Sequence, residues 1–147
     1  MKSLIGKLFG QGSRLSALES LILQAVRDQL SGTEADLWGK QVGEINKVQR
    51  LPDGIEANFY RMKGGKLRFD DSLAFANQAE ELLVATVQVS VPNAQEILTA
   101  SVWCVRGFVF SIEYKGSVKY FEEAAGMDPK LDIQIDCMMK ADLSKGS

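Results

Sequence analysis

The side chains that could do chemistry in this chain are carboxylates, arginines, tyrosines and asparagines, because histidine is absent from all 147 residues. A Ser-His-Asp triad, a Cys-His pair and the common zinc sites all need an imidazole. Cys104 and Cys137 lie far apart and form no C-x-x-C motif, which favours structural thiols in a reducing compartment. The composition therefore indicates no catalytic set, no metal site and no cofactor, and favours a protein that is not an enzyme.

One group of polar side chains flanks the turn at Pro52, Asp53 and Gly54. Proline presets φ and glycine accepts positive φ in such a turn, so we expect a hairpin with strands near 42–49 and 55–62. Its polar residues could recognise an anion or a protein partner, although a solvated sheet face is the commoner outcome. These candidates are Asn46, Arg50, Asn58, Tyr60 and Arg61.

A second group of candidates comes from the later, acidic half of the chain. Glu113 and Tyr114 end an aromatic segment, where a carboxylate could work as an acid or base, although simple alternation points Glu113 to solvent. Residues 1–69 carry 11 Lys/Arg and 7 Asp/Glu, whereas residues 70–147 carry 6 and 12. This asymmetry predicts an acidic surface able to attract a basic partner. Its members are Glu122, Glu123, Asp132 and Asp136.

Charge and hydropathy narrow the classes of partner. The net charge of −2 and the sequence pI near 5.2 disfavour nonspecific nucleic-acid binding, which depends on clustered cations. No run reaches the roughly 18 apolar residues that a membrane span needs, so we expect no stable membrane insertion. The two isolated cysteines, without a secretory pattern at residues 1–12, lead us to expect a cytoplasmic location. The KGGK turn at 63–66 lacks the spacing of a phosphate-binding loop, and we interpret it as an ordinary turn.

Hydrophobic periodicity predicts the elements that would position these residues. Residues 13–30 have a helical stripe, with Ser13 or Ser16 as cap and Glu19 placed for a capping box. Alternation predicts strands at 82–91, 96–105, 108–114 and a last, edge strand at 131–139. Short helices are expected from Asp71 or Ser72 to residue 81, and after Ser117. Residues 42–49 also fit a helical stripe through Trp38, so strand and helix both stay open there.

The two-residue turn at 106–107 implies a definite register. It pairs Val105 with Phe108 and Trp103 with Phe110, so these side chains share one face, on which we expect the leading helix to pack. The valines of 83–91 join that face only if the loop around Pro92 holds an odd number of residues, because an even loop sends them to the other side.

Together these elements predict one α+β domain, with an N-terminal helix packed on a twisted antiparallel meander of five or six strands and one or two short helices. Residues 1–12 are expected to form a lead-in that is possibly flexible, and the oligomeric state stays open. The stretches NKVQR, EANFYRM and VWCVRGFVFSIEY, within roughly residues 40–115, resemble segments of small bacterial domains of unassigned activity. In size, lack of histidine and layout the chain is also similar to immunity proteins, which neutralise toxins in bacterial competition.

That resemblance implies a protein-binding module that occludes a partner toxin. The interface would come from the acidic C-terminal surface or from the polar hairpin of residues 46–61. The alternative is a small-ligand protein, or an enzyme without histidine, with a pocket between helix and sheet near Trp103, Phe110 and Tyr114.

Overall fold

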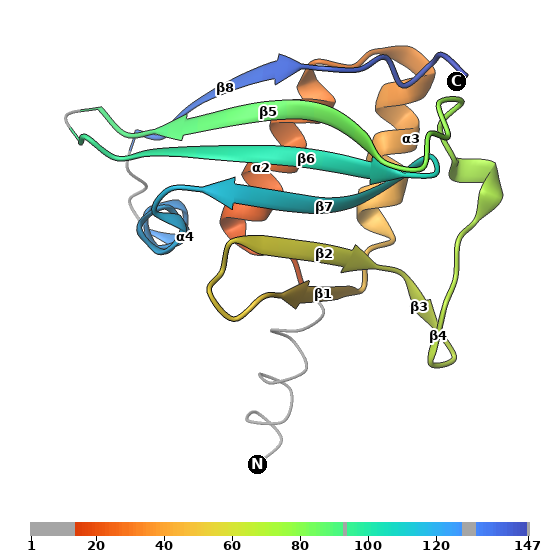
Figure 1. The fold of residues 1–147 in the computed structure, drawn as a ribbon, viewed down its shortest axis with the longest axis horizontal. Helices are drawn as coiled ribbons and strands as arrows, with labels where there is room; N and C mark the ends of the chain where they lie inside the picture. The colour runs from red at the N-terminus through yellow and green to blue at the C-terminus, as the bar shows by residue number, and fades with distance from the viewer. Residues whose placement is uncertain (1–13, 93, 128–131, 147) are drawn as a thin grey trace.

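Helices and a single large sheet form two layers in the computed structural model, which describes residues 14–92, 94–127 and 132–146 (Figure 1). Helices α2 (Ala17–Asp28) and α3 (Gly32–Gly43) lie behind the sheet, and α4 (Val118–Gly126) packs against α2. The six-stranded antiparallel sheet has the order β1-β2-β7-β6-β5-β8. The predicted α+β class, with the N-terminal helix packed on an antiparallel sheet, is confirmed.

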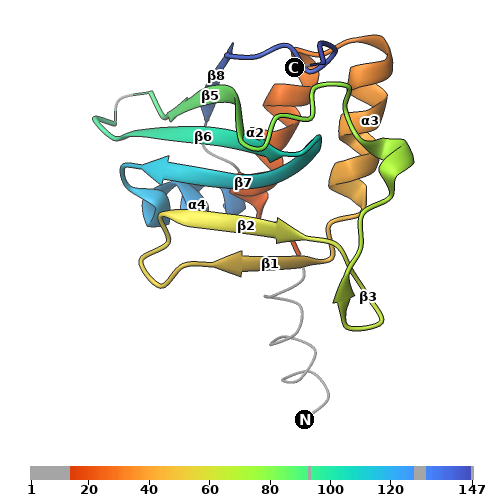
Figure 2. The ribbon, with the colours of Figure 1, turned by 45° about the vertical axis from the view of Figure 1, so that its right-hand side comes forward.

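The strands of the large sheet are β1 (Lys47–Arg50), β2 (Glu56–Tyr60), β5 (Leu82–Ser90), β6 (Ile97–Val105), β7 (Phe108–Lys115) and β8 (Gln134–Met139). A small hairpin of β3 (Met62–Lys63) and β4 (Lys66–Leu67) projects beside the large sheet (Figure 2). The central strands β5, β6 and β7 form the predicted meander. The last strand lies at an edge, as predicted, and pairs with β5.

Helix α2 begins where the capping pattern predicts. The Ser16 hydroxyl accepts a hydrogen bond from the Glu19 amide at 3.1 Å, and the Glu19 carboxylate accepts one from the Ser16 amide at 2.8 Å. Such a cap is worth about 1 kcal/mol. The apolar stripe of Leu18, Ile22 and Val26 is fully buried. The predicted helix is confirmed over these residues, while residue 13 lies outside the described part of the chain.

Helix α3 corrects the strand predicted at 42–49. The helix α3 continues to Gly43, and the strand β1 begins only at Lys47. Trp38 explains the choice, because its side chain is 1 % exposed and its indole N–H donates to the Leu23 carbonyl of α2 at 3.0 Å. A strand through this segment would alternate its side chains and lose that contact. The helical stripe through Trp38 therefore prevails.

The register between β6 and β7 is shifted by one residue from the prediction. Val105 pairs with Phe108 and Cys104 with Val109, as predicted, but Trp103 pairs with Ser111. Phe110 is the extra residue of a β-bulge, which moves every later pair by one position. The predicted pairing of Trp103 with Phe110 is therefore wrong. The turn itself is as predicted, since Arg106 and Gly107 both have positive φ, at 50° and 91°.

The leading helix packs on the face opposite to the predicted one. Ser90 pairs with Ile97, so six residues separate β5 from β6, and this even loop sends Val87 and Val89 to the face of Leu98 and Ala100. That face carries small and aliphatic side chains, which let α2 approach closely. Trp103 and Phe110 lie on the other side, so the prediction that the helix covers them is wrong.

The segment between β4 and β5 is mostly irregular. Only Asp71–Leu73 forms a 3-10 turn, capped by the Asp70 carboxylate, so the short helix predicted through residue 81 is wrong. The segment is held instead by backbone hydrogen bonds to the β6–β7 turn, from Phe75 N to Gly107 O and from Arg106 N to Ala79 O, both 2.9 Å.

The helices of the described residues are all too short or too polar to span a membrane.

Candidate functional site

The sheet has one face that no helix of the described residues covers (Figures 1 and 2). On β2, Ala57 and Phe59 are buried, so the residues between them project the other way. The registers of β2, β7 and β6 place alternate residues of the three strands side by side on this face. We call it the open face; its central residues are Glu56, Asn58, Tyr60, Thr99, Ser101, Trp103, Val105, Phe110, Ser111 and Glu113.

A hollow of about 300 Å³ lies on the open face. Its lining combines aromatic rings, carboxylates and small polar groups, and we call it the acidic hollow. The lining side chains are those of Trp103, Val105 and Phe110, of Glu56, Glu81 and Glu113, and of Asn58 and Ser111. No lysine or arginine is among these lining residues. The sequence prediction had singled out Asn58 and Glu113, and had placed Trp103 and Phe110 in a different, covered pocket.

Three polar groups in the acidic hollow lack partners. The Asn58 Oδ1 and Trp103 Nε1 atoms are shielded from solvent, yet neither has a hydrogen-bond partner in the described structure. Ser111 is 7 % exposed, and its hydroxyl makes no side-chain hydrogen bond with any described residue. Buried polar groups are nearly always hydrogen-bonded, and each orphan costs about 1–3 kcal/mol. These three groups are therefore available to a ligand or a partner.

Tyr60 supports one wall of the acidic hollow. Its ring meets that of Phe110 edge to face, with centroids 5.7 Å apart, and its hydroxyl donates to the Gln49 side chain at 3.0 Å. Such aromatic pairs have a preferred geometry, so the pair fixes the position of the Phe110 ring. Of the hairpin candidates, Asn58 and Tyr60 thus belong to the open face, and Tyr60 acts by holding Phe110 in place.

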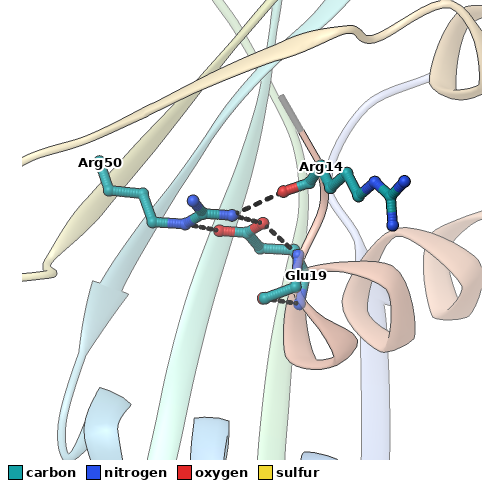
Figure 3. A network of polar contacts seen from close by, with 4 residues as sticks. Arg14, Glu19 and Arg50 are labelled. Atoms are coloured by element: carbon teal, nitrogen blue, oxygen red, sulfur yellow. Dashed lines mark hydrogen bonds and ion pairs between the residues drawn. The ribbon is translucent and has the colours of Figure 1, made fainter. Parts of the chain in front are cut away.

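Arg50, another hairpin candidate, is on the helix side of the sheet (Figure 3). Its Nε and Nη2 atoms donate to the two carboxylate oxygens of Glu19 at 3.0 and 2.8 Å, and Nη2 also donates to the Arg14 carbonyl at 2.9 Å. Glu19 is only 2 % exposed, and the hydrogen bond to it raises the pKa of Arg50. The bidentate pair joins the edge strand β1 to the start of α2.

Tyr114 and Glu122 lie beside this ion pair. They line, with Glu19 and Arg50, a hollow of about 280 Å³. Burial raises the pKa of the Tyr114 phenol and, together with the charge of Glu19, that of the Glu122 carboxyl. Tyr114 and Glu113 point to opposite faces of β7, so the adjacent pair singled out from the sequence is not brought together.

Arg61 and Asn46 lie where the hairpin leaves the large sheet. Arg61 is 5 % exposed, and its guanidinium donates to the carbonyls of Val109 at 2.8 Å and Gln41 at 3.2 Å, while its Nε has no partner. Burial lowers the pKa of Arg61 to about 10. The Asn46 side chain exchanges two hydrogen bonds with the Met62 backbone, at 2.7 and 2.8 Å. Both residues bond to the backbone.

Gln41 is a buried polar residue that the sequence analysis missed. Its Nε2 donates to the carbonyls of Leu73 and Gly107 at 2.6 and 2.8 Å, and its Oε1 accepts from the Val109 amide at 2.8 Å. Its position on the buried stripe of α3, three residues after Trp38, was the only available signal.

The acidic candidates of the C-terminal half are divided between two regions. Glu122 is half-buried and Glu123 exposed on α4, which packs against α2 behind the sheet. Asp136 is exposed on β8 opposite Gln88, on the open-face side of the sheet, and Asp132 is exposed just before that strand. They form no single acidic surface.

Metal binding and reaction at the Cys104 thiol find no support among the described residues. They contain no group of three or more Cys, Asp or Glu side chains that could hold a metal ion. Cys104 is buried and its pKa is raised by burial, which disfavours the reactive thiolate. The chain matches no protein-family model, no curated protein and no solved structure in the comparisons. The open face and its hollow are therefore the features of the described structure that bear on function.

Proposed function

We propose that this protein is a protein-binding module, and that the open face of its sheet is the surface that contacts the partner. The observation that carries the proposal is the acidic hollow, where polar atoms of Asn58, Trp103 and Ser111 are shielded or buried without a partner. A partner that supplied the missing hydrogen bonds to Asn58 and Trp103 would gain their full strength, because these two atoms are already shielded from solvent.

The composition of the hollow suits a protein partner. Tryptophan and tyrosine are enriched among the residues that dominate binding energy, and they concentrate at the centre of an interface. Trp103 is half-buried on β6, two residues before that strand ends, and β6 has a neighbouring strand on each side. The sheet holds these side chains rigidly, so a partner would lose little entropy in ordering them.

The more specific function that we propose is that of an immunity-type protein, which occludes a toxin in the cytoplasm of a bacterium. Its support is electrostatic, since Glu56, Glu81 and Glu113 line a hollow whose lining contains no lysine or arginine, and they would attract a basic partner. The two free cysteines are consistent with a reducing compartment.

The alternative of a ligand pocket between helix and sheet has weaker support, from the hollow of about 280 Å³ beside Tyr114, Glu19 and Arg50. The covered face is filled by side chains that are 0–1 % exposed, such as Ile22, Phe59 and Leu98. Trp103 and Phe110, two of the three expected walls of that pocket, lie on the other face, and Tyr114 lies on the covered one. A pocket reached only by repacking this core would cost several kcal/mol.

The test is an affinity purification of tagged variants from the native lysate, with bound proteins identified by mass spectrometry. Wild type and Phe69→Ala should retain the same partner, because Phe69 is an exposed aromatic residue outside the acidic hollow. Trp103→Ala and Glu113→Lys should each lose it. Circular dichroism would verify that all variants are folded. A partner that both hollow variants still bind at wild-type strength would overturn the proposal.

The immunity role has a further test of its own. If the retained partner is an enzyme, one equivalent of the wild-type module should abolish its activity and the Trp103→Ala variant should not. A partner whose activity is unaffected by a saturating amount of the module would refute this role, although the protein-binding function would stand.

A further inference from the structure

The acidic hollow contains a like-charge pair that the fold does not require. Glu56 of β2 and Glu113 of β7 are directly opposite each other in the strand register, on the face away from the helices. Carboxylates directly opposite on neighbouring strands repel each other. Neither forms an ion pair with a described residue, and Glu81 adds a third carboxylate to the lining. The arrangement lowers stability and concentrates negative potential in one place.

The unpartnered groups of the hollow point independently to a ligand. Ser111, which lines the hollow, is only 7 % exposed, and its hydroxyl forms no side-chain hydrogen bond with a described residue. The Asn58 Oδ1 atom beside it is an acceptor without a donor. Carboxylates, an amide oxygen and a hydroxyl are all acceptors. These acceptors call for a ligand with several donors and a positive charge. The Trp103 Nε1–H is a donor and needs an acceptor from another group of the partner, such as a backbone carbonyl.

The aromatic rings restrict the shape of that ligand. Trp103 and Phe110 line the same hollow, and an aromatic face attracts a cation placed over it. A guanidinium is planar, stacks on such rings and presents five N–H donors in a fixed fork, whereas an ammonium is a compact point charge with three. A planar donor set matches acceptors that come from two adjacent strands better than a point charge does.

We infer that the acidic hollow is a binding site for an arginine side chain of the partner protein, an inference that rests on the proposed function. The Glu56 and Glu113 carboxylates would neutralise the guanidinium, Asn58 and Ser111 would accept its remaining N–H groups, and an aromatic ring would cover its plane. Binding of the arginine would also relieve the repulsion between the two carboxylates.

The direct test uses small blocked amino acids and the folded full-length chain. Acetyl-arginine amide, acetyl-lysine amide and acetyl-citrulline amide would each be titrated while the indole N–H signals are followed by NMR. Trp38 is an internal reference, because its indole N–H is bonded to the Leu23 carbonyl on the covered side. The variant Trp103→Phe would assign the two signals.

The arginine probe should move the Trp103 signal saturably and leave the Trp38 signal unchanged. A single side chain of this size is expected to bind with a Kd on the order of 1 mM. Citrulline has the same shape without the charge and should bind at least about tenfold more weakly, with lysine between the two. Glu113→Gln should weaken the arginine probe about tenfold, and Glu123→Gln, on α4, should not change it.

A Trp103 signal that does not move, or citrulline binding as tight as arginine binding, would overturn the inference. This failure is distinct from failure of the proposed function. If Trp103→Ala loses the protein partner while arginine leaves Trp103 unchanged, the open face binds a partner by other chemistry. If arginine binds the hollow but the partner is retained by the hollow variants, the arginine site is real and the proposed interface is wrong.

Discussion

The two faces of one strand, β6, differ sharply in what they contribute. Leu98, Ala100, Val102 and Cys104 point toward the helices and are all 0–1 % exposed, whereas the alternate residues between them are half-buried on the open face. Burial of apolar area stabilises the fold by about 25 cal/mol per Å², so the covered face accounts for most of the stability that β6 contributes. The open face carries groups that the fold leaves unsatisfied.

Polar groups show the same contrast. On the covered side, the Trp38 indole and the Gln41 amide have all found backbone partners. On the open face, Trp103 and Asn58 keep shielded atoms without partners. A third shielded atom without a partner, Arg61 Nε, lies outside the acidic hollow. Orphan groups inside a fold are usually removed by packing or by hydrogen bonding, so the two that lie together in the acidic hollow favour contacts with another molecule there.

The two faces should differ most in how much stability is lost when an aromatic side chain is replaced by alanine. Phe59→Ala removes a side chain that is 1 % exposed on the covered face and should lower the free energy of unfolding by about 4 kcal/mol, since it leaves a cavity. Phe110→Ala, on the half-exposed open face, should lower the free energy of unfolding by about 1 kcal/mol or less. Urea unfolding followed by circular dichroism measures both. Equal losses would contradict the division between the faces.

The next largest difference in stability between the two faces is expected when a polar side chain is removed. Gln41→Leu leaves two carbonyls and the Val109 amide without the partners that Gln41 supplies and should lower the free energy of unfolding by about 3 kcal/mol. Asn58→Leu removes an atom that already lacks a partner, so stability should change by about 0.5 kcal/mol or less. A large loss in Asn58→Leu would show that its amide supports the fold.

The ion pair behind the sheet should have an intermediate effect. Arg50→Met keeps the apolar stem but leaves the Glu19 carboxylate, which is 2 % exposed, without its cation. We expect a loss of about 2 kcal/mol, below the value for a fully buried pair because the Arg50 side chain is 32 % exposed. In a double-mutant cycle with Glu19→Gln, a coupling energy near zero would show that the two charges act independently.

Neutralising a carboxylate of the acidic hollow should raise stability, whereas breaking the Glu19–Arg50 pair should lower it. Glu113→Gln removes the repulsion with Glu56 across the β2–β7 register and should raise the free energy of unfolding by about 0.5 kcal/mol. Glu123→Gln, an exposed change on α4, should leave it unaltered. Thermal unfolding at low salt compares them, and a destabilised Glu113→Gln variant would show that this carboxylate is structural.

The smallest effect is expected from a carboxylate on the helix side. Burial raises the pKa of Glu122 above its ordinary value of 4.5, so the folded state holds this proton more tightly than the unfolded state does. The associated stability is fully present below pH 4.5 and is lost as the pH rises through the folded pKa. Relative to wild type, Glu122→Gln should therefore gain stability between pH 4 and 7. A constant difference across that range would rule out this linkage.

The sequence predicted most elements but misplaced the aromatic face. The capping box at Ser16, the turn at residues 106–107 and the edge strand β8 depend on local patterns, and each was confirmed. The side covered by the helix follows from the even loop between β5 and β6. The later pairs between β6 and β7 depend on the bulge at Phe110, and no local signal marked that extra residue. One unpredicted residue thus changed which side chains meet across two strands.

The candidate site was predicted only in part for the same reason. Asn58 and Glu113 were identified, and their meeting in one hollow followed from the β2–β7 register. Arg50, Arg61 and Tyr114 looked equally available in the sequence, yet they lie on the helix side or bond to the backbone. Polarity alone cannot show whether a side chain is already satisfied by the fold.

By itself the sequence determined the class of the fold, the alternation of each central strand and the lack of imidazole chemistry, because these follow from composition and local periodicity. Only the tertiary structure decided which face of the sheet the helices cover and which polar groups stay without partners. These outcomes depend on loop parity, on a single bulge and on contacts between residues far apart in the chain, such as Glu56 with Glu113.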